Sequence, residues 1–450
     1  MLVQPQSMEK VRRSTNDLYF VAQGGDMVRV ETNDQNGAFQ TDEVPFCTHC
    51  PQAYRRPPDS ELEPDLTGYL QPYREEIQAF LQEPLVNNPE RAVFLSQLLK
   101  TPGEIIRESQ RLHFNIIGDV LKKYKAAMLF DIADFENKGD PCITVGEILF
   151  LARINLPVVY YCSSLSCTDE NMRKARKLAA NYSPDELVVL FHGGGNLVGY
   201  RFNDFFRFKT MDLFAGYHFL LFPQSIFYNN AQDEHVKLCE REYCCNENLT
   251  LVLRDLQTYS FAKEHFKGKT KLLLAPDIAF QIGNVNRFQS PVFDVMWIKR
   301  IDYEAPNYGS IPEHPSDVRF HVSDWWSWKT NDAPTSLEKA FYVSVEGFNF
   351  LSRGRVLVTD RLHGHILSTL MNMPHVLVDN RYKKLSSYHN SWTKGLENTK
   401  LTNQPEKAMA MILDLLDVHQ QDLPPRVPFM DLAENFQQRN FEEEEFAKYS

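Results

Sequence analysis

The feature that most constrains the fold of this chain is an alternation of short apolar runs with amphipathic stretches, which begins near Lys125. The runs AAMLFDI at 126–132 and ELVVLFH at 186–192 have the length of buried strands and are too short for most helices. Further runs of this kind lie at 156–162, 217–223, 249–254 and 271–277. Apolar runs that alternate with helical segments are typical of βαβ units, so the sequence predicts an α/β protein with parallel strands.

A second series of apolar runs follows a loop near Gly283, and its members lie at 292–300, 318–324, 355–360 and 375–379. The chain has 450 residues, which is enough for more than one hydrophobic core. We therefore expect two Rossmann-like, doubly wound lobes, over 111–283 and 284–430. The irregular stretch 1–110 is interpreted as an N-terminal extension that is partly disordered, and 431–450 as a charged tail.

Charge and hydropathy exclude several classes of function. The formal net charge of -11 is spread along the chain, which argues against nucleic acid as a general partner. No apolar stretch approaches the roughly 20 residues of a membrane-spanning helix. The first residues, MLVQPQSMEKVRRSTND, lack the apolar core of a signal peptide. As written, the sequence predicts a soluble protein without a membrane span, and it leaves the compartment open.

The cysteines are few for a chain of this length. They are Cys47, Cys50, Cys142, Cys162, Cys167, Cys239, Cys244 and Cys245. Because they are too sparse for a disulfide scaffold, most are expected to be reduced core residues. The CTHC pair Cys47 and Cys50 could supply half of a zinc site, but no second CxxC or HxxxH follows it. A plain loop pair is favoured, and no metal site is predicted.

Polar residues follow two strands of the first series, where ligands of doubly wound sheets bind. Asn137 and Asp140 lie in a polar turn after the first strand. Gly193, Gly194, Gly195 and Asn196 follow the third strand. Three glycines allow backbone amides to approach an anion or a sugar hydroxyl, although a tight turn explains the run equally well. Their spacing fits neither a dinucleotide fingerprint nor a GxxxxGK[ST] phosphate loop.

Two arginines and a histidine stand at strand ends. Arg254 ends the run LTLVLR, where a guanidinium is costly without an anion; a salt bridge to Asp255 or Asp277 is the alternative. Arg361 and His363 lie between a strand and a helix, where the helix dipole and free amides favour a phosphate or carboxylate. The alternative there is that Arg361 pairs with Asp360 and His363 caps the helix.

The order of the motifs DxxxxxNxGD, HGGGN, FPQS, LxxRD, APDIAF, TDRLHG and DNxYxK over about 125–400 resembles the polysaccharide pyruvyl transferases. The resemblance implies a GT-B-like fold of two lobes, with phosphoenolpyruvate as the donor in place of a nucleotide sugar. It implies that Arg254, Arg361, the Leu362 amide and His363 contact this donor.

The chain departs from the family pattern at two places. The glycine run continues into Leu197-Val198-Gly199-Tyr200 without the usual Gly-Asp pair, and Lys383 replaces a small residue beside the matching Lys384. Both differences concern the acceptor side of the cleft. We expect Asn137, the glycines 193–195, Asn196 and Lys384 to line this side or the cleft wall.

The residue types suit transfer of a pyruvyl group to a sugar diol, with a cyclic pyruvate ketal as the product. Two forked guanidinium groups match a donor that carries both a carboxylate and a phosphate. His363, with a usual pKa near roughly 6.5, can transfer protons at neutral pH, and Asp140 can orient or deprotonate the acceptor. No cofactor is required in this scheme, and a glycan or glycoside is the expected partner.

Two other functions stay open at this level. A GT-B glycosyltransferase with a nucleotide-sugar donor would have the same fold, because a fold does not determine its substrate. A catalytically silent sugar-binding protein is suggested by the altered glycine run. The presence of Arg254, Arg361 and His363 together argues against the silent protein.

Overall fold

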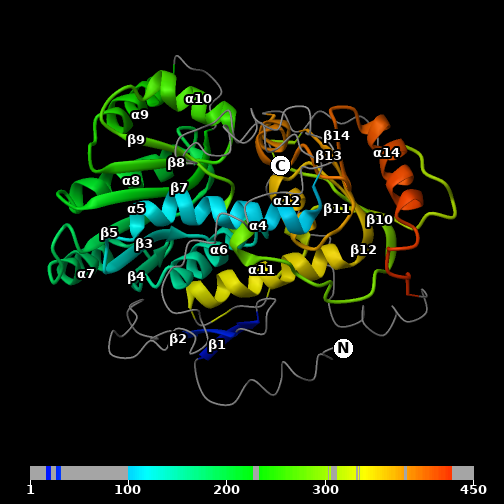
Figure 1. The fold of residues 1–450 in the computed structure, drawn as a ribbon, viewed down its shortest axis with the longest axis horizontal. Helices are drawn as coiled ribbons and strands as arrows, with labels where there is room; N and C mark the ends of the chain where they lie inside the picture. The colour runs from blue at the N-terminus through cyan, green and yellow to red at the C-terminus, as the bar shows by residue number, and fades with distance from the viewer. Residues whose placement is uncertain are drawn as a thin grey trace, which may run out of the picture.

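The structure is a computed structural model with two parallel sheets that lie side by side (Figure 1). It describes residues 100–226, 233–302, 304–305, 312–330, 333, 335–379 and 383–427, and the backbone of one antiparallel hairpin, β1 (Asp17–Val21) and β2 (Met27–Glu31). The pair Cys47 and Cys50 and the expected tail over 431–450 lie outside the described residues.

The first sheet has the strand order β4-β3-β5-β7-β8-β9, all parallel, with β6 paired to β7. Its strands are β3 (Ala126–Ile132), β4 (Val158–Ser163), β5 (Leu187–Phe191), β6 (Gly194–Leu197), β7 (His218–Ile226), β8 (Leu249–Leu253) and β9 (Lys271–Leu274). The chain runs outward from β3 to β4 and then returns to β5 on the other side of β3. The carboxyl ends of β3 and β5 therefore form a topological switch point, where doubly wound sheets bind their ligands.

The second sheet repeats this arrangement with the order β11-β10-β12-β13-β14, again all parallel. Its strands are β10 (Phe293–Ile298), β11 (Phe320–Ser323), β12 (Gly354–Thr359), β13 (His375–Val378) and β14 (Thr399–Thr402). The two series of apolar runs thus form two parallel sheets, consistent with the expected Rossmann-like lobes.

Helices cover the sheets, and of the longer helices that the structure describes, five begin at a side-chain cap. The longer ones are α4 (Pro102–His113), α6 (Gly139–Arg153), α7 (Asp169–Ala179), α8 (Arg201–Leu213), α9 (Glu234–Cys244), α10 (Leu256–His265), α11 (Ser336–Ser352), α12 (Leu362–Leu370) and α14 (Pro405–Val418). The short ones are η3 (Phe114–Gly118), α5 (Asp119–Leu121), η4 (Ile278–Ile282), η5 (Trp325–Ser327), α13 (Lys384–Tyr388) and η6 (His389–Thr393). Capping boxes start α4 at Thr101 and α11 at Thr335. Among the described residues, no helix is both long and apolar enough to cross a membrane.

Two helices join the lobes into one buried core. Helix α11 follows strands of the second sheet but packs on α6 and β3 of the first lobe. Helix α4, cyan in Figure 1, contacts η4 and α12, and its side chains of Ile105 and Ile106 are buried. The limit near residue 110 expected for the N-terminal extension therefore falls inside α4, which is part of the core. Burial of apolar surface at these contacts stabilises one arrangement of the lobes.

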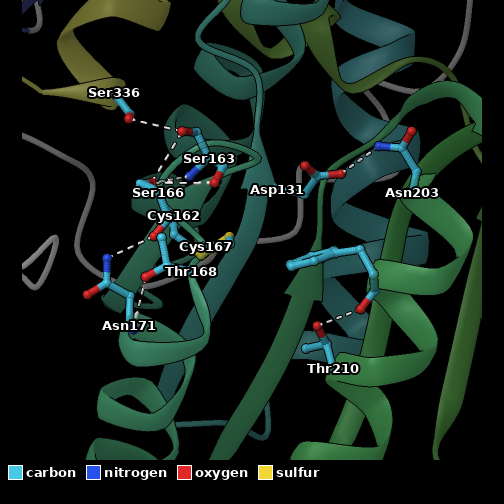
Figure 2. Close-up of a disulfide and its surroundings, with 11 residues drawn as sticks. Asp131, Cys162, Ser163, Ser166, Cys167, Thr168, Asn171, Asn203, Thr210 and Ser336 are labelled. Carbon is cyan, nitrogen blue, oxygen red and sulfur yellow. Dashed lines mark hydrogen bonds between the residues drawn. A yellow bond between two sulfur atoms is a disulfide. The ribbon is translucent and has the colours of Figure 1, made fainter.

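The expectation that most cysteines are reduced is wrong for four of the six described ones. Cys162, in β4, and Cys167, just after it, form a disulfide (Figure 2), and the neighbours Cys244 and Cys245 form another. Cys142 and Cys239 are buried thiols. The paired cysteines are close in sequence, and in the first pair the N–H of Cys167 donates to the carbonyl of Ser163 in a tight turn. Cysteines this close in sequence can pair in a chain that has too few cysteines for a disulfide scaffold.

Three buried histidines connect α12, β13 and η6 through one directional chain of hydrogen bonds. His389 Nδ1 donates to Thr393 Oγ1 (3.0 Å), which donates to His365 Nε2 (2.8 Å). His365 Nδ1 donates to His375 Nε2 (2.6 Å), whose Nδ1 donates to the Met373 carbonyl (2.7 Å). The Met373 carbonyl can only accept, so these directions follow when each ring carries one proton. Burial lowers the pKa of His375 and of His389 to about 4 and holds that of His365 well below its usual range.

These histidines should make the second lobe sensitive to acid. Their folded pKa values lie below the unfolded value near 6.5, so the unfolded chain binds more protons between pH 6.5 and about 4. Stability is fully present above pH 6.5 and is lost as the pH falls through this window. For each of His375 and His389, we expect the free energy of unfolding to drop on the order of 1–2 kcal/mol from pH 7 to pH 5.

Urea denaturation at a series of pH values measures this loss. The variant His375→Asn should reduce the difference between pH 7 and pH 5, whereas His314→Asn, at an exposed histidine, should leave it unchanged. An equal pH dependence in wild type and His375→Asn would contradict the role of the histidine chain.

Candidate functional site

The site begins where the N-terminus of α12 meets the N-terminus of α6, so one helix comes from each lobe. His363, the second residue of α12, lies against Gly139, and any Cβ at Gly139 would collide with its imidazole ring. Only glycine permits this approach. It brings His363 Nδ1 to 3.9 Å from Asp140 Oδ1 and His363 Nε2 to 3.5 Å from Asp277 Oδ2.

His363 has an unusual environment for a buried histidine. Its Nε2 is buried and makes no hydrogen bond with the part of the chain that the structure describes. Buried polar atoms nearly always have partners, so such an atom marks a candidate for function. Asn137 Nδ2 donates to Asp140 Oδ2 (2.6 Å) and thereby fixes the carboxylate whose other oxygen faces His363. The structure thus brings together the predicted residues Asn137, Asp140 and His363.

Arg254 follows β8 and is buried beside Asp277, the aspartate that His363 Nε2 approaches. Its Nη1 donates to Asp277 Oδ2 (2.7 Å) and its Nε donates to Ser225 Oγ (2.8 Å). The salt bridge to Asp277, one alternative from the sequence, is therefore present. Burial raises the pKa of Asp277, but His363 and Arg254 outweigh burial and hold it well below its usual range. Asp277 is accordingly an anion held between Arg254 and His363.

The third glycine of the run at 193–195 lies against two cations. A Cβ at Gly195 would lie 2.9 Å from Arg254 Nη2 and 3.5 Å from Lys384 Nζ. Lys384 comes from α13 of the second lobe, and its Nζ contacts Glu304 Oε1 at 2.8 Å. Burial lowers the pKa of Lys384, as do the nearby Arg300 and Arg254, while Glu304 opposes this shift. A cluster of positive charge therefore faces Gly195 from both lobes.

Glu304 balances this cluster. Besides Lys384, it binds Arg300 Nη1 at 2.8 Å through Oε2, and it accepts a hydrogen bond of 2.8 Å from Tyr200 OH. Burial raises the pKa of Glu304, but Lys384 and Arg300 outweigh burial and hold it below its usual value. Arg254, Arg300 and Lys384 are thus each paired with a buried carboxylate.

Gly193 and Gly194 have a different role from Gly195. The N–H of Gly193 donates to Glu147 Oε1 (2.8 Å), and Gly194 has a φ of 124°, which disfavours any other residue. Asn196 is held within the first lobe, because its side-chain oxygen accepts from Arg207 and its N–H donates to Gln224 Oε1 (3.2 Å). The run continues into β6 at Gly194 and does not form the tight turn that was the alternative, and its third glycine lies beside Arg254 and Lys384.

Arg361 is paired, although not with the neighbour that the sequence suggested. Its Nε donates to Asp324 Oδ1 (2.8 Å), and its Nη2 donates to Asp324 Oδ2 (2.5 Å) and to Asp302 (3.2 Å). Asp360 instead accepts from the N–H of Arg300 (3.0 and 3.1 Å). Leu362 is the first residue of α12, where backbone N–H groups have no partner within the helix.

Sequence reasoning missed the carboxylates that hold these cations. Asp277 entered only as an alternative partner of Arg254, and Asp302, Glu304 and Asp324 were not considered. The signal was present, because Asp277 follows β9, Asp302 and Glu304 follow β10, and Asp324 follows β11. The rule that ligands bind beyond the carboxyl ends of strands would have included all four.

A separate buried cluster lies between α8 and α9. The potential metal-ligating atoms of Asp204, His235 and Cys239 all lie within 4.8 Å of one another. Asp204 already accepts hydrogen bonds from His235 Nε2 (2.9 Å) and Tyr243 OH (2.8 Å), and Arg207 lies 3.3 Å away. These contacts satisfy the carboxylate and join the two helices, which is a structural role.

Comparisons with known proteins identify the family of this chain. A model of the polysaccharide pyruvyl transferase family matches residues 109–382. Pyruvyl transferase 1 of Schizosaccharomyces pombe is 32% identical over 328 residues, which are 67% of this chain and 80% of that protein. EpsO of Bacillus subtilis, by its name a proposed pyruvyl transferase, is 25% identical over 317 residues, which are 64% of this chain and 92% of that protein.

A solved structure of a functionally uncharacterised protein from Klebsiella pneumoniae is similar with a TM-score of 0.43 at 18% identity, and the match covers 64% of this chain and 95% of that chain. The family match includes Asn137, Asp140, Arg254, Asp277 and His363, the residues that meet between the two helix N-termini. The resemblance found in the sequence is confirmed, and the chain belongs to the polysaccharide pyruvyl transferase family.

Proposed function

We propose that this protein transfers the pyruvyl group of phosphoenolpyruvate to two neighbouring hydroxyls of a sugar and forms a cyclic pyruvate ketal on a glycan. One observation carries the proposal. Arg254, which is buried, and Lys384, which is 10% exposed, face Gly195 from the two lobes, and Asp277 contacts both Arg254 and His363 Nε2. A site for a small, doubly anionic molecule beside a proton-transfer group suits this donor.

The donor anions would replace contacts that the cations now make with protein carboxylates. We infer that Arg254 Nη2 and Lys384 Nζ bind the donor beside Gly195. The amides of Leu362 and His363, at the N-terminus of α12, supply further donors for a phosphate or carboxylate. Asp324 and Asp302 occupy Nε and Nη2 of Arg361, so this residue would contact the donor through Nη1.

The proposed reaction balances without a cofactor. Protonation of the methylene carbon of the donor creates a cationic centre at the neighbouring carbon, which one sugar hydroxyl attacks with loss of its proton. The bond to phosphate then breaks, and its electrons leave with the phosphate oxygen. The second hydroxyl closes the ketal as its proton departs. His363 and Asp140, 3.9 Å apart, are the proposed groups for proton transfer on the donor side.

The donor can be tested against the nucleotide-sugar alternative, which a GT-B-like fold would equally permit. We expect the protein, incubated with phosphoenolpyruvate and a panel of glycosides that have free neighbouring hydroxyls, to release one phosphate for each pyruvate ketal detected by mass spectrometry. Thermal shift should show stabilisation by phosphoenolpyruvate and none by nucleoside diphosphates. Stabilisation by nucleoside diphosphates alone, without ketal formation, would favour a glycosyltransferase.

The glycine that faces the cations offers a specific test of the donor site. In Gly195→Ala the new methyl group would displace the ends of Arg254 and Lys384, which are flexible, so the fold should survive. We expect affinity for phosphoenolpyruvate to fall about tenfold or more, which corresponds to about 1.4 kcal/mol. Isothermal titration measures this change.

Gly103→Ala, in α4 and remote from the cleft, is the matched control and should leave the affinity unchanged. Unaltered binding of phosphoenolpyruvate by a folded Gly195→Ala would exclude this place for the donor.

His363 should act on turnover more than on donor binding. Loss of a proton-transfer group lowers rates by about 10²- to 10⁴-fold, so we expect a fall of this size in kcat for His363→Gln. The dissociation constant for phosphoenolpyruvate should change much less. Initial rates combined with isothermal titration separate the two effects, and a variant that loses donor binding but keeps kcat would reverse the assignment.

A further inference from the structure

A second buried histidine lies at the switch point of the first sheet, outside the set already described. His192 directly follows β5, and its side chain contacts Glu147 of α6, with 3.0 Å between Nδ1 and Oε2. Glu147 is fully buried, and its other oxygen accepts the N–H of Gly193 at 2.8 Å. One carboxylate therefore fixes both the orientation of His192 and the start of the glycine run.

The second ring nitrogen of His192, Nε2, has no hydrogen-bond partner among the described residues. His192 is 5% exposed, and its Nε2 is buried and makes no hydrogen bond with the residues that the structure describes. A histidine that served only to pack would be expected to have this atom satisfied, because leaving it unpaired costs about 1–3 kcal/mol. His192 shares this property with His363.

The backbone beside His192 is also unusual. The N–H of His192 donates to the carbonyl of Phe130 (3.1 Å), so the next residue of β3, Asp131, is its neighbour across the sheet. Asp131 has a φ of 64° at a register shift of β3, a local distortion that redirects a side chain. Its carboxylate accepts from Asn203 Nδ2 at 2.9 Å, as Figure 2 shows.

Helix α6 connects this histidine to the donor side of the site. Asp140 and Glu147 are seven residues apart on one face of α6, which is about 10 Å along the helix. Asp140 faces His363, and Glu147 faces His192. The carboxylates that face His363 and His192 are therefore two turns apart on one side of α6.

We propose that His192, oriented by Glu147, accepts the proton of the attacking sugar hydroxyl, whereas His363 serves the donor. This assignment rests on the proposed function. As the hydroxyl oxygen forms its bond to the cationic carbon, its O–H bond breaks and the proton moves to Nε2 of His192. The imidazolium then passes this proton to the departing phosphate or to solvent. Glu147 is a positioning residue, because it holds the proton of His192 on Nδ1 and leaves Nε2 as the acceptor.

Charged groups around His192 support this role. Burial by itself lowers the pKa of His192, but Glu147 and Asp140 of α6 and Asp131 of β3 outweigh burial and raise it. From α8, the charge of Arg207 acts on Asp131. Burial raises the pKa of Glu147 and of Asp131, and His192 opposes this rise, so an imidazolium at His192 and the two carboxylates stabilise each other's charges.

The test compares His192→Asn with wild type. The asparagine amide can replace Nδ1 as the donor to Glu147 and removes Nε2 alone. We expect kcat for the sugar acceptor to fall by about 10²- to 10⁴-fold, with the affinity for phosphoenolpyruvate unchanged. In wild type, kcat/KM should fall at acidic pH as His192 becomes protonated. The residual activity of His192→Asn should not show this fall. Glu147→Gln should lower kcat while acceptor KM changes little, because an amide donating to Nδ1 moves the ring proton to Nε2.

His235→Asn is the matched control, because His235 is a buried histidine of the same lobe whose Nε2 contacts Asp204 at 2.9 Å. It should lower the melting temperature and leave kcat of the folded enzyme unchanged. If wild type forms no ketal from phosphoenolpyruvate, the proposed function itself fails. If wild type forms the ketal and His192→Asn matches its kcat and pH profile, only the assignment of His192 is overturned.

Discussion

The arrangement of the cleft depends on one buried anion, Asp277. Arg254 binds it from the first lobe at 2.7 Å, and His363 approaches it from the second lobe at 3.5 Å. A buried carboxylate without such partners would be protonated or would destabilise the fold, since the desolvation of a charge is costly. Here the cationic neighbours keep the pKa of Asp277 well below its usual range. The position of α12 relative to the first sheet is therefore coupled to the charge state of the site.

The hydrophobic core fixes the position of α12 relative to the first sheet. Helix α11 packs across α6, and α4 contacts both η4 and α12, so the lobes share apolar contacts as well as charges. Arg254, Asp277 and His363 are consequently buried. Electrostatic interactions are stronger where water is excluded, and groups that are already oriented need no rearrangement during the reaction. The carboxylates Asp277 and Glu304 balance the charges of Arg254 and Lys384 at this site.

Much of the fold was predictable because the apolar runs are local signals. The run at 126–132 corresponds to β3 over the same residues, and the rule about strand ends led to Arg254, Asp140 and His363. The partners of these residues were not predictable, because they come from distant segments. Arg361 pairs with Asp324 instead of the adjacent Asp360, and Lys384 meets Glu304 across a separation of 80 residues. The disulfide of Cys162 and Cys167 depends on a tight turn after β4, which cysteine counts alone do not reveal.

The most direct test of the account is a crystal structure of the protein with phosphoenolpyruvate bound. The account predicts that the anionic groups of the donor lie beside Gly195, within about 3 Å of Arg254 Nη2 and Lys384 Nζ. The methylene carbon should then face the cleft near His363. A donor bound elsewhere, with the contacts of Arg254 to Asp277 and of Lys384 to Glu304 unchanged and no donor atom near either cation, would contradict the account.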